Sequence, residues 1–185
     1  MLASRNAHKA RELEVLLPGW TIEPFEAEEW PEESGATYYD NALIKVRFAW
    51  REGGWAIGED SGIEVAALGG RPGLYSARYA AEGLPAITKL LGELAGVEER
   101  SARYVSELVA IAPGGDVLRG TGVLTGRVGL EPRGSEGFGY DPIFIPDGEE
   151  RTVAELGDAW KAENTHRARA ARALREALAR RGAGA

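Results

Sequence analysis

Four segments of the chain have the spacing or composition of helices. In the first segment Leu13, Leu16 and Leu17 fall on one helical face, and Ser4 or Asn6 stands where a helix cap is needed. The Pro-Gly-Trp that follows ends this segment, because proline and glycine interrupt helices. The patterns predict helices over residues 7–17, 37–51, 84–95 and about 158–181.

Strand-like segments lie between the predicted helices. The clearest spans residues 101–128, where two long strands are joined by Pro-Gly-Gly-Asp, a hairpin signal. Shorter strands are predicted at residues 1–4 and 20–25, and residues 53–70 suggest two strands separated by an acidic turn. Helices and strands alternate early and a long hairpin follows, which predicts a mixed α/β fold. No repeat or linker divides the chain, so we expect a single domain over residues 1–185.

Composition and charge narrow the class of protein. Apolar residues make up 44% of the chain, as in ordinary globular domains. No apolar run approaches the length of a membrane span, the first residues lack a signal peptide's apolar region, and there is no cysteine. We therefore expect a cytoplasmic protein with no membrane partner and no thiolate chemistry. A net charge of −7 argues against a nucleic-acid partner, whereas a locally basic site for a small anion stays possible.

Residue types that the chain otherwise avoids gather in three windows. There is no glutamine, and there are three asparagines, two histidines and four lysines against eighteen arginines. All three asparagines, both histidines and three of the four lysines fall in residues 6–9, 40–45 and 161–167. Ordinary surface use would scatter them, so the clustering indicates a functional site.

Two of these windows have the chemistry of phosphate binding. Residues 4–9, Ser-Arg-Asn-Ala-His-Lys, follow a predicted strand and open a helix, where backbone N–H groups attract anions. Asn41 and Lys45 are four residues apart, so they share a helical face that can reach phosphate oxygens. The alternatives are a capped surface helix for residues 4–9 and a polar helix face for Asn41 and Lys45.

A third cluster is acidic. Glu59 and Asp60 stand side by side after a predicted strand, and Glu32 and Glu33 lie in an acidic loop. Carboxylates used together with water and substrate phosphates are the ligands that Mg²⁺ prefers. The alternative is a solvated acidic turn. Carboxylates and lysines in separate motifs together favour a site for a magnesium polyphosphate.

The remaining motifs suit a ring-shaped ligand. Phe138 lies between two glycines, which can bring its ring close to a flat base. Polar side chains for the edge of such a base are available at Asp141, Lys161, His166 and Arg167. The alternatives are a phenylalanine packed into the core and, for residues 161–167, an ordinary capping sequence.

Five motifs occurring in this order resemble the non-canonical purine nucleoside triphosphate pyrophosphatases, the inosine/xanthosine triphosphate pyrophosphatase family. The resemblance covers about residues 3–180 and is carried by SRNAHKARELEVLL, ESGATYYDNALIKVRFA, DSGIEVAALGGRPGLYSARYA, GFGYDPIF and KAENTHRARAARAL. It implies a mixed α/β fold: a long, curved central mixed β-sheet flanked by helices, with two lobes and a cleft between them. It also implies Mg²⁺-dependent hydrolysis of dITP, ITP or XTP to the monophosphate and pyrophosphate by a homodimer.

The resemblance assigns roles residue by residue. Asp60 would be the general base and a metal ligand, and Glu32 the other metal ligand. The triphosphate would be held by Ser4, Arg5, Asn6, Ala7, His8, Lys9 and Lys45. Ser61 would touch the substrate, and the base would be bound by Phe138, Gly139, Tyr140, Asp141, Lys161, His166 and Arg167.

The chain departs from the family's motifs at four positions, the first of which is Ser4 in place of a threonine. Arg5 replaces a glycine, Glu59 replaces the first aspartate of Asp-Asp-Ser-Gly, and Thr165 replaces a serine. The metal ligand beside Asp60 is open among Glu32, Glu33 and Glu59, and the spacing to Gly35 favours Glu32. Two other functions are also open: a nucleotide-binding sensor without turnover, and a septum-inhibitor type of pyrophosphatase acting on modified pyrimidine triphosphates.

Overall fold

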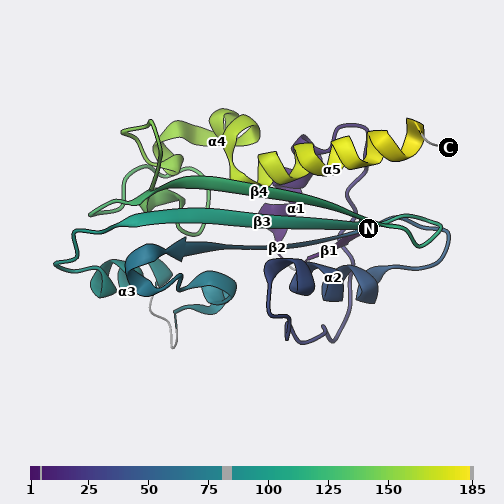
Figure 1. The fold of residues 1–185 in the computed structure, drawn as a ribbon, viewed down its shortest axis with the longest axis horizontal. Coiled ribbons are helices and arrows are strands. Elements are labelled where there is room, and N and C mark those ends of the chain that lie inside the picture. Colours follow the sequence, from purple (N-terminus) through teal and green to yellow (C-terminus); the bar gives the residue numbers. More distant parts are fainter. Residues whose placement is uncertain (5, 81–84, 184–185) are drawn as a thin grey trace. The chain divides into compact units, whose positions relative to one another are not determined.

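The computed structural model describes residues 1–4, 6–80 and 85–183, which form a mixed α/β fold (Figure 1). The strands are β1 (Leu2–Ala3), β2 (Ala56–Val65), β3 (Ser101–Ile111), β4 (Val117–Val128) and β5 (Phe144–Pro146). The helices are α1 (Ala7–Leu16), α2 (Tyr38–Ala49), α3 (Ala86–Glu93), α4 (Val153–Asn164) and α5 (His166–Ala183). Short 3₁₀ turns are η1 (Ala66–Leu68), η2 (Gly73–Arg78) and η3 (Asp141–Ile143).

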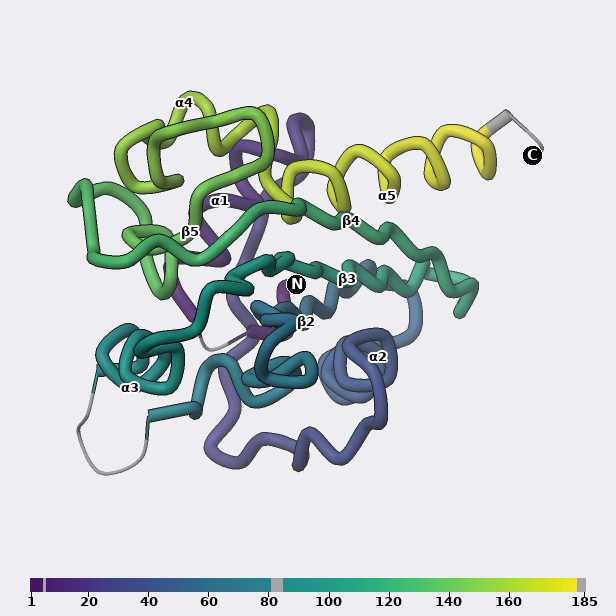
Figure 2. Tube along the Cα trace, turned by 60° about the vertical axis from the view of Figure 1, so that its left-hand side comes forward, coloured from purple at the N-terminus to yellow at the C-terminus, as the bar shows by residue number. Residues whose placement is uncertain are grey.

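The five strands form one sheet in the order β1-β2-β3-β4-β5. β1 runs parallel to β2, with Leu2 opposite Ile57, and β5 runs antiparallel to β4, with Phe144 opposite Val128. The sheet is therefore mixed, as predicted. The trace in Figure 2 turns sharply between β3 and β4, where the predicted hairpin is confirmed.

The chain divides into two compact units, and each has its own core. Unit 1 consists of Met1–Asp60, Ser106–Gly122 and His166–Ala185, and unit 2 of Ser61–Val105 and Val123–Thr165. Strands β2, β3 and β4 contribute residues to both units. The core of unit 1 includes Leu2, Leu13, Leu108, Val46 and Leu174, and that of unit 2 includes Ile63, Leu90, Tyr104, Phe144 and Val153.

In unit 1, glycines of β4 allow the backbone of α5 to approach closely (Figure 1). A Cβ atom on Gly122 would lie 1.9 Å from the carbonyl oxygen of His166 and 2.4 Å from the amide nitrogen of Ala170. A Cβ atom on Gly120 would lie 2.2 Å from the carbonyl oxygen of Ala170. These contacts fix the first two turns of α5, which carry His166 and Arg167.

Residues 53–70 were predicted as two strands and an acidic turn, and this is wrong: β2 runs without interruption from Ala56 to Val65. Gly58 allows the backbones of β2 and α2 to approach closely, since a Cβ there would lie 2.2 Å from the carbonyl oxygen of Ala42. The acidic residues that follow Gly58 remain in the strand because cations from other elements pair with them, as described below.

The predicted strand at 20–25 is also wrong. It forms only an isolated bridge between Leu2 and Pro24, since proline cannot donate to a ladder. The final predicted helix is divided, because Thr165 has extended backbone angles and separates α4 from α5. The other predicted helices correspond to α1, α2 and α3, although residue 84 of the range 84–95 lies outside the described residues.

Replacing Gly122 with alanine should destabilise the protein. The added methyl group would overlap the α5 backbone, so we expect the free energy of unfolding to fall by about 1–3 kcal/mol. Gly114→Ala is the matched control, because Gly114 is exposed and no atom lies within 4 Å of its Cβ position. Urea unfolding of the two variants measures the difference, and equal stabilities would contradict the close approach of α5 to β4.

Candidate active site

Two adjacent carboxylates in β2 are at the centre of the site in unit 1. Consecutive residues of a strand point to opposite faces of a sheet. The partners of Glu59 and Asp60 follow this alternation: Glu59 meets side chains from α1 and α5, and Asp60 meets side chains from α2. Glu59 and Asp60 therefore belong to different environments.

Asp60 is held by two residues on one face of α2. The ammonium of Lys45 donates to Asp60 Oδ1 at 2.8 Å and to Glu33 Oε1 at 3.1 Å. Asn41, four residues before Lys45, donates from Nδ2 to Asp60 Oδ2 at 3.3 Å and accepts the amide N–H of Gly35 at 2.8 Å. Asn41 thus ties Asp60 to the loop that carries Glu33.

The charge balance of this cluster shifts two pKa values upward. Burial raises the pKa of Asp60, and Lys45 offsets only part of this effect. Burial alone would lower the pKa of Lys45, but Asp60, Glu59 and Glu33 outweigh it, so that pKa is raised. The raised pKa of Asp60 thus follows from its burial, and the raised pKa of Lys45 from the carboxylates around it. Asp60 is therefore a stronger base than an exposed aspartate, beside a lysine that stays charged.

Glu33 and Asp60 are the carboxylates that could hold a metal ion. Both carboxylates contact the same ammonium of Lys45, so they converge on one point. Glu32, the predicted second ligand, is exposed in the loop before Glu33. Among the residues described, no three acidic or histidine side chains form a metal-binding group. Mg²⁺ is commonly held by one or two carboxylates together with waters and substrate phosphates, so two suffice.

Glu59 is buried among cations on the other face of β2. Its Oε2 lies 2.6 Å from Lys9 Nζ, and its Oε1 accepts from Arg167 Nη2 at 3.1 Å and from Ser106 Oγ at 3.1 Å. Arg167 also pairs with Glu12 of α1. Burial alone would raise the pKa of Glu59, but Lys9, Arg167 and Lys45 hold it well below its ordinary value. Glu59 therefore joins β2 to α1, β3 and α5.

The segment before Lys9 forms a capped turn. Asn6 Oδ1 accepts the amide N–H of His8 at 2.9 Å and of Lys9 at 3.3 Å, and Ser4 Oγ accepts the N–H of Asn6 at 3.2 Å. Ala7 and His8 are exposed in the first turn of α1. Arg5, the other residue predicted to hold the triphosphate, lies outside the described residues.

A second cluster lies in unit 2 around Asp141. Asp141 Oδ2 accepts from Lys161 Nζ at 2.9 Å and from the amide N–H of Phe138 at 3.0 Å. The Lys161 ammonium lies 5.0 Å from the centre of the half-buried Phe138 ring. Tyr104 adds a longer hydrogen bond to Asp141 Oδ1, at 3.4 Å. A cation is thus fixed at the face of an aromatic ring.

The structure also places the other residues that were predicted to bind the substrate. Tyr140 is buried and donates from its hydroxyl to the carbonyl of Ser76 at 2.9 Å, and burial raises its pKa. Gly139 has a positive φ of 63°, and Ser61 is half-buried in β2. His166 and Arg167, predicted to act with Lys161, begin α5 in unit 1, whereas Lys161 belongs to unit 2.

Several contacting residues were not among the predicted site residues. No motif in the sequence indicated that Ser106 would contact the site. Glu12 lies three residues after Lys9, so helical spacing places both on one face of α1. Asn41 and Glu33 were noted in the sequence, but their contacts with Asp60 and Lys45 depend on the tertiary fold.

Solved structures place this fold among the Ham1 proteins. The chain is similar to the Staphylococcus aureus Ham1 protein, with a TM-score of 0.84 and 32% identity over 97% of both chains. A HAM1 protein from Coxiella burnetii gives the same TM-score with 35% identity, again over 97% of both chains. A dITP/XTP pyrophosphatase of Gloeobacter violaceus is 40% identical over 177 residues, which cover 94% of this chain and 91% of that protein. A family model described as the Ham1 family matches residues 1–177, and the chain belongs to this family.

Replacing Glu59 with glutamine should destabilise the protein strongly at pH 7. It would leave Lys9 and Arg167 buried without their shared carboxylate, a loss of about 3–5 kcal/mol. The folded-state pKa of Glu59 lies below its ordinary value of 4.5, so its stabilising contribution is complete above that value and is lost on acidification. We therefore expect wild-type stability to fall more steeply than that of Glu59→Gln as the pH drops below 4.5.

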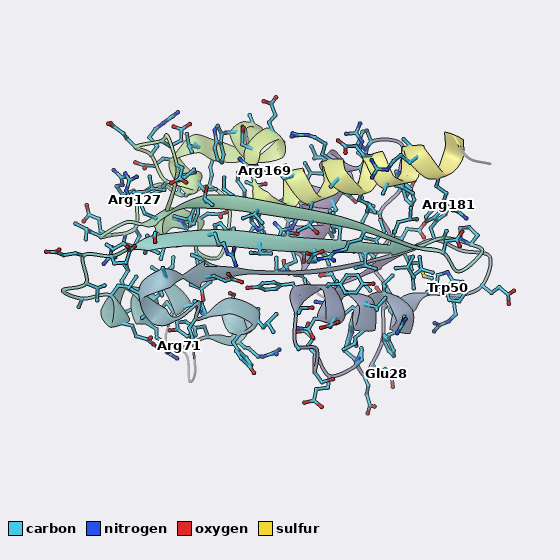
Figure 3. All side chains as sticks on the ribbon, in the orientation of Figure 1. Glu28, Trp50, Arg71, Arg127, Arg169 and Arg181 are labelled. Atoms are coloured by element: carbon cyan, nitrogen blue, oxygen red, sulfur yellow. The ribbon has the colours of Figure 1, made fainter. Side chains whose placement is uncertain are left out.

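Urea unfolding across this pH range measures both effects. The control is Asp116→Asn, because Asp116 pairs with Arg181 near the end of α5, where both side chains are exposed (Figure 3). That loss should be below about 1 kcal/mol. A cost for Glu59→Gln as small as that of the control would contradict the structural role of Glu59.

Proposed function

We propose that this chain hydrolyses dITP, ITP and XTP to the nucleoside monophosphate and pyrophosphate. The observation that carries the proposal is the arrangement of Asp60, a buried carboxylate of raised pKa held by Lys45 and Asn41 beside Glu33. The Ham1 family match and the relatives named dITP/XTP pyrophosphatase support the same reaction.

Asp60 would act as the general base. A carboxylate held by Asn41 and Lys45 can accept a proton from a water that it orients, and burial raises its pKa, which favours the proton transfer. The water would attack the α-phosphorus in line while the bond to the bridging oxygen breaks, and pyrophosphate leaves. Asn41 and Lys45 would orient Asp60 during this step. Lys9, Lys45 and the start of α1, capped by Asn6, would hold the triphosphate.

The metal ion proposed for this reaction is Mg²⁺, held by Asp60 and Glu33. When bound, it would neutralise charge on the phosphate oxygens as pyrophosphate leaves. Glu32 was the second ligand predicted from spacing, but the contact that Glu33 shares with Lys45 and Asp60 favours Glu33. Glu59 leaves the strand on the other face and is committed to Lys9 and Arg167.

The base would be selected in unit 2. Phe138 offers a ring for stacking, and the Lys161 ammonium, which is held by Asp141 at the face of that ring, would donate to the base. Hypoxanthine and xanthine have a keto acceptor at position 6, whereas adenine has an amino donor that a lysine cannot satisfy. Guanine shares the keto group, so its rejection requires a contact at position 2. Arg167 pairs with Glu59 and Glu12, which favours a structural role over base reading.

The oligomeric state and the cellular location of the protein are also proposals. A homodimer and a cytoplasmic location rest on the family membership. No helix in the described ranges is long and apolar enough to span a bilayer.

The first test is pyrophosphate release from dITP, XTP, dGTP and dATP, each with and without Mg²⁺. We expect Mg²⁺-dependent release from dITP and XTP, with dATP slower by at least about a hundredfold because its amino group would face a donor. Equal rates on all four substrates would contradict the proposed base pocket. No release from any of them would contradict the enzyme assignment and favour a binding protein.

Asp60→Asn serves as the catalytic control. Asparagine keeps the size of the side chain but cannot accept the proton, so kcat should fall by about 10²- to 10⁴-fold. Urea unfolding checks that the variant remains folded. Activity near that of the wild type would contradict the role of Asp60.

The metal assignment is tested by Glu33→Gln against Glu32→Gln. If Glu33 is a ligand, its replacement should raise the Mg²⁺ concentration needed for half-maximal rate by roughly tenfold to a hundredfold. Glu32 is exposed, so its replacement should leave that concentration unchanged. The opposite ranking would restore Glu32 as the ligand.

A further inference from the structure

The segment between β4 and η3, residues 129–140, is called the Phe138 loop. It runs along α4 and contacts it at successive turns. Thr152 Oγ1 donates to the carbonyl of Arg133 at 2.8 Å at the start of α4. Further along, a Cβ on Gly134 would lie 2.6 Å from the backbone of Ala154. A Cβ on Gly137 would lie 2.9 Å from Lys161 Nζ. The loop and the helix are therefore packed together from residue 133 to residue 137.

Glu136 makes the contact in the middle of this packed region, at a break in α4. Gly157 interrupts the helix with φ 82° and ψ 175°, a conformation that residues with side chains avoid. With no side chain, Gly157 cannot accept the N–H of the residue after the break. Glu136 Oε2 accepts the amide N–H of Asp158 at 3.0 Å, and it lies 2.8 Å from where a Cβ of Gly157 would be. The carboxylate of Glu136 thus satisfies one of the N–H groups that have no partner within the helix at the start of this segment.

Lys161 belongs to the helical segment that begins at this contact. It lies three residues after Asp158, one helical turn further on, in the segment that starts at the break. Its ammonium meets Phe138, which belongs to the same loop as Glu136, and Asp141, which directly follows that loop. The described contacts that join this segment to residues 136–141 include the Lys161–Asp141 ion pair, the contact of Lys161 with the Phe138 ring and the hydrogen bond from Asp158 to Glu136.

We propose that Glu136 is a positioning residue for base recognition, acting through Lys161. Its hydrogen bond to Asp158 fixes the helical segment against the loop, so that the Lys161 ammonium stays in register with Phe138 and Asp141. Glu136 is exposed and touches neither ring nor ammonium in the contacts described here. The inference rests on the proposed function, in which Lys161 donates to the keto group of the base.

The first test compares Glu136→Ala, Glu136→Gln and the wild type with dITP. Loss of the acceptor should raise KM by about fivefold to tenfold, the effect of one lost hydrogen bond, with kcat within about twofold. Glutamine keeps an acceptor oxygen, so Glu136→Gln should retain the wild-type KM. The matched control is Glu131→Ala, another exposed glutamate before Phe138, which should also retain it. An unchanged KM in Glu136→Ala would overturn the inference.

A double-mutant cycle tests whether the effect passes through Lys161. Binding of dITP is measured by calorimetry with Asp60→Asn as the background and without added Mg²⁺, so that hydrolysis during the titration is minimal. Glu136→Ala should weaken binding when Lys161 is present and should have little further effect in Lys161→Met. Equal losses in both backgrounds would overturn the proposed route. If the wild type hydrolysed neither dITP nor XTP, the proposed function itself would fail, which is a separate outcome.

Discussion

The site in unit 1 depends on the burial of one carboxylate. Glu59 is 1% exposed, in the middle of β2, and a carboxyl so deep in the protein would be protonated without nearby cations. Lys9 and Arg167 supply the positive charge that keeps Glu59 ionised. They depend on Glu59 in turn, since each is largely withdrawn from water. The ion pairs hold α1 and α5, which lie at opposite ends of the chain, to the same strand. The turn that opens α1 is thereby placed beside β2.

The next residue along the strand has the opposite environment. Asp60 points to the α2 face, where it shares one lysine with Glu33, whereas Glu59 has two cations and Ser106. The balance of charge therefore lowers the pKa of Glu59 and leaves that of Asp60 raised. Two adjacent carboxyl groups of similar chemistry are thus separated into a structural anion and a candidate base. The pleat of the strand makes this separation possible.

Local patterns predicted the elements that depend on local interactions. The spacing of Leu13, Leu16 and Leu17 predicted α1, and the Pro-Gly-Gly-Asp sequence predicted the hairpin, because caps and turns depend on neighbours in sequence. The continuous β2 was not predicted, since Glu59 and Asp60 are compatible with a strand only when distant lysines and an arginine pair with them.

The clustering of scarce residues pointed to three lysines that meet buried carboxylates in the structure. Lys9, Lys45 and Lys161 each pair with a buried carboxylate. Their partners could not be predicted, because spacing in the sequence does not say which carboxylate a lysine reaches. The choice between Glu32 and Glu33 is the clearest case: adjacent in sequence, they differ only in the side chain that the fold directs toward Lys45.

The charge of each cluster suits the part of a nucleotide that it would hold. In unit 2, Lys161 and Asp141 balance each other, and a neutral base needs a fixed donor rather than an uncompensated cation. Gly137 makes that pairing possible, since a Cβ there would lie 2.2 Å from Asp141 Oδ2. In unit 1 four carboxylates face three cations: Glu12, Glu33, Glu59 and Asp60 against Lys9, Lys45 and Arg167. Among these described residues the carboxylates are in excess by one, so a divalent cation bound by Glu33 and Asp60 would favour the approach of a triphosphate.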